Sequence, residues 1–318
     1  MTSLIEKAAL RLEQLRQAGV DVSAADAAHQ PAVGPRVSPP AVPASAPVVS
    51  APAEPVSRAV ELDLATLMNR GFVTPHASRS TIADQFRVIK RPLLANATGK
   101  GASVVSNGNL IMITSAMPGE GKSFTAINLA MSIAMELDYR VLLVDADVAR
   151  PSLMRELGLP ATKGLLDLLL DERMEMSDVL LRTNVDKLSL LPSGSPHPRA
   201  TELLASDAMT RLIEEMGQRY PDRIIIFDSP PLLLTTESRV LATHMGQVVM
   251  VVQAEKTLQS QVRHAMTTIE ACPIKLLVLN QARGGDQDAY GYGYGYGYGY
   301  GGAGNATADT PSPATAQA

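Results

Sequence analysis

The sequence predicts an α/β fold with a doubly wound, mostly parallel sheet, and two observations carry that prediction. Short, continuously apolar runs recur along the chain, and longer amphipathic stretches separate them. Apolar strands that alternate with helices are typical of a parallel sheet covered on both faces. Ligands of such sheets bind at the carboxyl ends of the strands. The predicted strands are residues 110–113, 141–144, 188–191, 224–227, 248–252 and 276–279.

Composition excludes several classes of protein. The chain has 318 residues and a formal charge of −4, which gives no general reason to bind nucleic acid. Cys272 is the only cysteine and the five histidines are scattered, so we expect neither disulfides nor a thiolate metal site. No apolar run approaches the roughly 20 residues that span a bilayer, and no signal peptide is apparent. We therefore expect a cytoplasmic protein that reaches a membrane only through a partner.

The chain divides into four predicted segments. Residues 1–22 form an amphipathic helix with Leu4, Ala8, Leu12 and Leu15 on one face, and a frayed helix is the alternative. Residues 23–60 are an Ala/Pro-rich disordered linker, 61–285 the folded domain, and 286–318 a flexible Tyr/Gly-rich tail.

A glycine-rich loop follows the first predicted strand. It reads Thr-Ser-Ala-Met-Pro-Gly-Glu-Gly-Lys-Ser from position 114 to position 123 and precedes an apolar helix. Gly119 and Gly121 let successive backbone amides face phosphate oxygens, and the helix N-terminus favours negative charge. Lys122 would reach the β/γ phosphates and the Ser123 hydroxyl could ligate Mg²⁺. The motif usually begins with glycine, where this chain has Ala116. The predicted nucleotide-contacting residues are Pro118, Gly119, Glu120, Gly121, Lys122, Ser123 and Phe124.

Three aspartates follow two other predicted strands. Asp145 and Asp147 come directly after residues 141–144, and Asp228 follows residues 224–227 and precedes Pro230 and Pro231. Carboxylates at neighbouring strand ends can approach a metal–phosphate cluster, and Mg²⁺ is the natural partner of a buried one. The alternative for the first two is a helix-capping pair. A phosphate loop, a lysine and carboxylates are the parts that phosphoryl transfer needs.

With the tyrosine-rich tail, these motifs resemble the bacterial tyrosine kinase family (BY-kinases) of capsule and exopolysaccharide systems. The resemblance is nearest to the XrtA-associated tyrosine autokinases and spans roughly residues 84–300. The family's Walker A loop, second aspartate motif, Walker B motif and tyrosine cluster occur in order. The resemblance implies a P-loop NTPase of the Min/Par-like (SIMIBI) type that uses ATP and Mg²⁺.

The resemblance also implies a role for each site residue. Lys122 would polarise the phosphates, and Asp145 would assist deprotonation of the incoming tyrosine. Ser123, Asp147 and Asp228 would hold Mg²⁺, which makes Lys122 and the three aspartates the predicted catalytic set. Asn280, at the end of the last strand, resembles the adenine-contacting Asn of related ATPases; a polar strand-end cap is the alternative.

The chain departs from the family pattern at two places. Both Val148 and Ala149 separate Asp147 from Arg150, where the family often has a single residue before the arginine. The family's oligomerisation helix reads Glu-x-x-Arg-x-x-Arg, whereas this chain has Asp84, Arg87 and Lys90. An ordinary solvated helix face is the alternative interpretation of those charges.

The tail carries tyrosines that alternate with glycine, which leaves each ring mobile and accessible. The bland alternative is a sticky low-complexity segment. About 17 residues of flexible chain reach roughly 20–25 Å, which is comparable to a neighbouring subunit's site. The predicted phosphoacceptors are Tyr290, Tyr292, Tyr294, Tyr296, Tyr298 and Tyr300.

The predicted function is an ATP-dependent tyrosine autokinase that modifies its own tail and regulates exopolysaccharide biosynthesis and export. The expected partners are an integral-membrane polysaccharide chain-length regulator as activator, further copies in a ring, and a cognate tyrosine phosphatase. The protein would then be peripheral at the inner membrane. One alternative is a Min/Par-type positioning ATPase, although its signature lysine is replaced by Met117 and it lacks such a tail. The other is a non-catalytic ATP clamp in a polysaccharide export complex.

Overall fold

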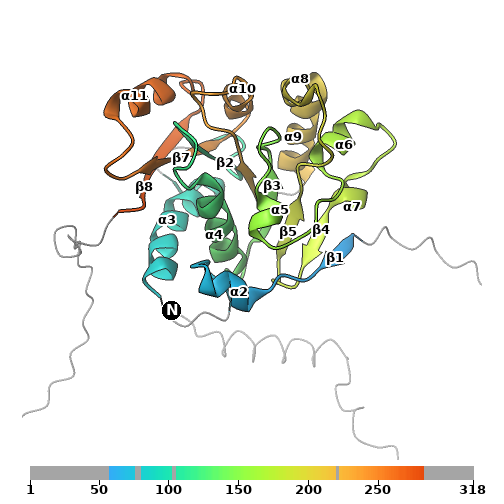
Figure 1. The fold of residues 1–318 in the computed structure, drawn as a ribbon, viewed down its shortest axis with the longest axis horizontal. Helices are drawn as coiled ribbons and strands as arrows, with labels where there is room; N and C mark the ends of the chain where they lie inside the picture. The colour runs from blue at the N-terminus through green and yellow to red at the C-terminus, as the bar shows by residue number, and fades with distance from the viewer. Residues whose placement is uncertain (1–56, 76–79, 102–104, 220–221, 283–318) are drawn as a thin grey trace, which may run out of the picture. The chain divides into compact units, whose positions relative to one another are not determined.

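The computed structural model describes residues 57–75, 80–101, 105–219 and 222–282. These residues build one eight-stranded sheet flanked by helices (Figure 1). The strands are β1 (Arg58–Val60), β2 (Leu110–Ser115), β3 (Arg140–Asp145), β4 (Leu181–Thr183), β5 (Leu188–Leu191), β6 (Arg223–Asp228), β7 (Gln247–Gln253) and β8 (Ile274–Asn280). The helices are α2 (Leu64–Asn69), α3 (Thr81–Ala97), α4 (Lys122–Ala134), α5 (Leu153–Glu156), α6 (Leu165–Leu170), α7 (Met176–Val179), α8 (Ala200–Leu204), α9 (Asp207–Arg219), α10 (Glu237–Thr243) and α11 (Gln259–Thr267).

The sheet has the order β1-β4-β5-β3-β6-β2-β7-β8. From β5 to β8 every neighbouring pair is parallel, whereas β4 runs antiparallel to β5 and β1 is parallel to β4. All predicted strands are confirmed, and the prediction of a mostly parallel sheet is confirmed with them. The phosphate-loop strand β2 lies in the middle, between β6 and β7.

Side chains alternate along each central strand between two cores. Ile111 and Ile113 of β2 face the core that α2 to α5 cover. Leu110 and Met112 face the other core, which is covered by α6 to α11. Because side chains of a strand point to opposite faces in turn, a continuously apolar strand requires helices on both sides. The two cores confirm the doubly wound architecture.

Sequence analysis missed two strands, β1 and β4. Each has only three residues, which is too short to show a periodic pattern. β1 lies inside residues 23–60, the predicted linker, so the last residues of that range are a strand rather than disordered chain. The side chain of Asn184 fixes the segment after β1, because it accepts from the Leu62 amide at 2.9 Å and donates to the Leu62 carbonyl at 3.0 Å.

The predicted N-terminal helix, most of the linker and the tyrosine tail lie outside the described residues. Apart from the end of the linker, where β1 lies, the division of the chain into four segments therefore stays a prediction. Within the ranges that the structure describes, no helix combines the length and apolar character that crossing a membrane requires.

Helix α3 corrects one expectation about surface charge. Asp84 and Arg87 are exposed and form an ion pair with each other. Lys90, however, is buried, and its ammonium lies 2.6 Å from the Glu136 carboxylate and donates to the Ser132 carbonyl at 2.6 Å. Lys90 therefore holds α3 against the end of α4 and does not share a solvated face with the other two residues.

Candidate active site

The glycine-rich loop connects β2 to α4 in the predicted strand–loop–helix order. Gly119 has a φ of 84° and Gly121 a φ of 94°, in the left-handed region that side chains disfavour. A Cβ on Gly121 would also lie 2.1 Å from the Asn280 side-chain nitrogen. Gly121 is the N-cap of α4, so the loop delivers the chain directly to the helix N-terminus. Both glycines are thus required by the backbone path, as the motif predicts.

Lys122 opens α4 and points toward the second aspartate motif. Its ammonium lies 2.7 Å from Oδ2 of Asp147, and these side chains are only 13% and 4% exposed. The other oxygen of Asp147 accepts from the Arg150 amide at 3.2 Å. The ammonium is therefore held at the strand ends by a carboxylate, which a phosphate would have to replace.

Asp145 and Asp228 end neighbouring strands and are register partners of β3 and β6. Both are fully buried, and burial raises the pKa of Asp145 to about 8 and that of Asp228 to about 6. The Asp228 carboxylate adds to the shift of Asp145, whereas the Lys122 cation opposes the shift of Asp228. The raised pKa values mean that too little positive charge lies nearby to stabilise two charged carboxylates. A bound cation would supply that charge and lower both pKa values.

Hydrogen bonding within the described residues supports that conclusion. Oδ2 of Asp145 accepts from the Leu153 amide at 3.1 Å, but its Oδ1 and both oxygens of Asp228 have no hydrogen-bond partner there. Buried polar atoms in that state usually meet a ligand, ion or water. In the same ranges, no three His, Cys, Asp or Glu side chains are grouped as a ready-made metal site. Mg²⁺ commonly combines one or two carboxylates with phosphates and water, so the arrangement fits that ion.

A pocket of about 530 Å³ opens beside Lys122 and Asp147. The chain after β6 forms one wall, and the loop after β3 contributes Arg150 to another. The one extra residue before Arg150, relative to the family pattern, therefore leaves Arg150 at the pocket. Sequence analysis did not predict five of the lining residues, because nothing in the local pattern marks them. These are Ser152, Arg155, Pro231, Leu234 and Thr235.

Ser123 and Ser152 meet across the loops. The Ser152 hydroxyl donates to Oγ of Ser123 at 2.8 Å, although the two lie 29 positions apart in the chain. The predicted metal-ligating hydroxyl thus has a partner that sequence spacing could not reveal.

Two residues predicted at the nucleotide face the protein with their side chains. The Glu120 carboxylate is buried, accepts from the Met117 amide at 2.8 Å and also accepts from the Thr257 hydroxyl. The Phe124 ring packs on Phe72, with 5.1 Å between the ring centroids. Only the backbones of Glu120 and Phe124 remain for phosphate binding.

Asn280 lies at the end of β8, next to the phosphate loop. Its side-chain amide donates to the Glu120 carbonyl at 2.9 Å. Its own carbonyl accepts from the Ala254 amide at 2.9 Å. The sequence-based expectation of an adenine contact stays a prediction, and the structure places the amide on the loop backbone.

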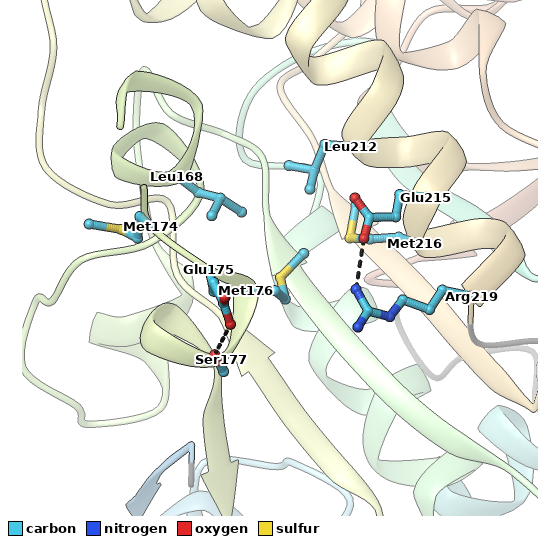
Figure 2. A pocket seen from close by; sticks show the side chains of 9 residues that line it. All are labelled: Leu168, Met174, Glu175, Met176, Ser177, Leu212, Glu215, Met216 and Arg219. Carbon is cyan, nitrogen blue, oxygen red and sulfur yellow. Dashed lines mark hydrogen bonds and ion pairs between the residues drawn. The ribbon is translucent and has the colours of Figure 1, made fainter. Parts of the chain in front are cut away.

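A second pocket, of about 420 Å³, contains none of the predicted site residues (Figure 2). Figure 2 shows it between the α6–α7 segment and α9, with Met176 and Met216 among its lining. Its polar groups pair locally, since Arg219 donates to Glu215 at 2.8 Å. The predicted site residues Lys122 and Asp147 line the pocket of about 530 Å³ instead.

Fold and site together define a class, the P-loop nucleotide-binding proteins. A family model described as an AAA domain matches residues 108–277, just over half of the chain. The tyrosine-protein kinase YwqD of Bacillus subtilis is 33% identical over 235 residues, which are 73% of this chain and 95% of the relative. The tyrosine-protein kinase CpsD of Streptococcus agalactiae is 32% identical over 190 residues, 57% of this chain and 81% of the relative. The chain belongs to the bacterial tyrosine-protein kinases.

Solved structures agree with that assignment. The crystal structure of the chimerical protein CapA2B2 has a TM-score of 0.57 and 30% identity, covering 71% of this chain and 94% of that one. The VpsO kinase domain has a TM-score of 0.51 and 26% identity, covering 64% of this chain and all of that one. The likeness to XrtA-associated autokinases stays a prediction.

Proposed function

We propose that this protein is an ATP-dependent tyrosine autokinase that phosphorylates its own C-terminal tyrosines and thereby regulates exopolysaccharide biosynthesis and export. One observation carries the proposal. In a chain of the tyrosine-kinase family, a half-buried lysine and three buried aspartates meet at the strand ends beside a phosphate loop. Two of the aspartates have unpartnered oxygens. Related relatives are named tyrosine-protein kinases, which supports this activity over a positioning ATPase.

The residues would divide the chemistry as follows. Lys122 would exchange Asp147 for the β/γ phosphates of ATP, and the amides of the glycine-rich loop would bind the same phosphates. Ser123, Asp147 and Asp228 would hold Mg²⁺, which when bound neutralises charge between the phosphates. The γ-phosphorus–oxygen bond to ADP breaks as the tyrosine oxygen bonds to phosphorus.

Asp145 would take the phenol proton on its unpartnered Oδ1. That role requires a charged carboxylate, whereas burial holds the pKa of Asp145 at about 8 without a cation. A cation beside Asp228 lowers the pKa of Asp145, so the base becomes available only in the loaded site.

The proposal extends to partners. The tail lies outside the described residues, so the sequence alone supports its role. We infer that its six glycine-flanked tyrosines are phosphorylated by a neighbouring copy in a homo-oligomer. An integral-membrane chain-length regulator would activate the kinase and hold it at the inner membrane, and a tyrosine phosphatase would reverse the modification. Asp84 and Arg87 remain exposed for contact between copies, whereas Lys90 is buried.

The decisive experiment incubates the purified chain with γ-labelled ATP and Mg²⁺ and maps the label by mass spectrometry. We expect phosphate on the segment from Tyr290 to Tyr300 and none in Lys122→Met. Lys163→Met, which changes an exposed lysine, is the matched control and should label normally. Phosphate release without protein label would favour the positioning ATPase. Retained nucleotide without label or release would favour the clamp.

Transfer between copies has its own test. A Lys122→Met subunit with intact tyrosines is mixed with an active subunit whose six tail tyrosines are replaced by Phe. Label on the inactive subunit, at a rate that rises with protein concentration, is expected. An unlabelled inactive subunit together with concentration-independent wild-type kinetics would mean transfer within one chain.

A further inference from the structure

Two side-chain amides at the end of β8 donate hydrogen bonds to the backbone of the phosphate loop. Asn280 donates to the carbonyl of Glu120 at 2.9 Å, and the Gln281 side chain donates to the carbonyl of Gly119 at 3.2 Å. The partners lie 160 and 162 positions apart in the chain. Consecutive residues of one strand end thus grip consecutive carbonyls of the loop.

The geometry of the peptide bond turns these contacts into an effect on the phosphate cradle. In a trans peptide, the carbonyl of one residue and the N–H of the next point in opposite directions. Gln281 holds the Gly119 carbonyl toward the end of β8, so the Glu120 N–H points away from it. Asn280 holds the Glu120 carbonyl in the same way, so the Gly121 N–H also points away from the end of β8. Amides of this loop that point away from β8 are available as donors to phosphate oxygens.

Gln281 is itself held in place. The Gln253 side chain, at the end of β7, donates to its Oε1 at 2.6 Å. Its backbone has a φ of 58°, in the left-handed region that residues with a Cβ disfavour. Gln281 also follows β8 directly, so the strand fixes the point from which the side chain extends. Gln281 thus combines a disfavoured backbone conformation with a side-chain amide that makes two hydrogen bonds. Together they indicate that the structure fixes the orientation of this side chain.

We propose that Gln281, together with Asn280, is a positioning residue that orients the phosphate-binding amides of the P-loop. The inference rests on the proposed nucleotide binding and adds that residues outside the loop orient its amides. Gln281 acts through the loop backbone on the phosphates and makes no contribution to recognition of the base.

The test compares two probes, ATP and inorganic triphosphate, by calorimetry on the full chain. Gln281→Met keeps the length of the side chain and removes its hydrogen-bond donor. We expect both probes to bind about tenfold more weakly, which corresponds to about 1.4 kcal/mol, and kcat at saturating ATP to stay unchanged. Gln259→Met, which changes an exposed glutamine on α11, is the control and should bind both probes like the wild type.

A second variant separates the side chain from the backbone. Gln281→Gly suits the left-handed conformation but lacks the amide, so we expect it to bind both probes as weakly as Gln281→Met. Wild-type affinity in the glycine variant would overturn the proposal. A loss of ATP affinity with unchanged triphosphate affinity would overturn it too, because it indicates a base contact.

Asn280→Leu tests the neighbouring residue in the same way. We expect this variant to bind triphosphate more weakly than the wild type. Different results would overturn nucleotide binding and the positioning role. Absence of triphosphate binding by the wild-type chain would overturn the phosphate site and the proposed function. Normal wild-type binding with an unaffected Gln281→Met would overturn only the positioning role.

Discussion

The two ends of α4 each have a lysine–carboxylate ion pair, but the helix dipole disfavours one lysine and favours the other. At the N-terminus Lys122 pairs with Asp147, and at the C-terminus Lys90 pairs with Glu136. A helix N-terminus carries partial positive charge, which disfavours a lysine there, whereas the C-terminus favours one. Lys90 also donates to the Ser132 carbonyl in the last turn. Lys122 is therefore the lysine placed against the helix dipole, and an anionic ligand, as we propose, would relieve that unfavourable interaction.

Lys122→Met should have the largest effect of any single change. We expect autophosphorylation to fall by about three orders of magnitude or more, since the cation that stabilises the transferring phosphoryl group is lost. The fold should persist, because Gly119, Gly121 and the helix define the loop. Phosphotyrosine mass spectrometry measures the first effect and thermal unfolding the second. Wild-type phosphotyrosine in this variant would remove Lys122 from the site.

Asp145→Asn and Asp228→Asn should each lower turnover by roughly two orders of magnitude, because each removes charge needed near the phosphates. Glu136→Gln changes a carboxylate at the other end of α4 and is the control, which should leave turnover unchanged. Rates are measured with saturating ATP and Mg²⁺. A near-normal rate in either aspartate variant would exclude that residue from the chemistry.

The same aspartates predict how the metal-free protein responds to pH. Their folded pKa values, about 8 and about 6, lie above the ordinary value of 3.8, so the folded state binds more protons than the unfolded state. The free energy of unfolding should therefore fall as pH rises from about 4 to about 8, by several kcal/mol in total. Denaturant titrations in chelator would measure it.

Asp145→Asn should lower that slope from pH 4 to pH 8 and nearly abolish it between pH 6 and 8, where Asp145 is the only one of the two that still holds a proton in the folded state. An unchanged slope in this variant would mean that Asp145 does not titrate there.

Lys90→Met should affect stability rather than catalysis. Its side chain is 7% exposed while that of Glu136 is 41% exposed, so water can solvate the carboxylate left behind. We expect a loss of about 1–2 kcal/mol, below the 3–5 kcal/mol typical of fully buried pairs. Chemical denaturation measures the loss, and kcat per folded molecule should stay at the wild-type value. A large fall in kcat would show that the two ends of α4 are coupled.

Local patterns in the sequence determined the central strands and the phosphate loop. Apolar runs such as 141–144 predict buried strands because burial on both faces admits no polar residue. Gly119, Gly121 and Lys122 predict their own geometry, because a left-handed turn into a helix is a local requirement. Asp145 and Asp228 were predictable as strand-end carboxylates because each directly follows an apolar run.

Only the tertiary structure decided which groups meet. The order of the sheet brings Asp145 beside Asp228, and sequence spacing does not contain that neighbour relation. Burial of Lys90 depends on the packing of α3 against the end of α4, and the contact of Asn280 with Glu120 joins residues 160 positions apart. Hydrogen bonds of that kind depend on distances that the chain acquires only after its strands have been placed side by side.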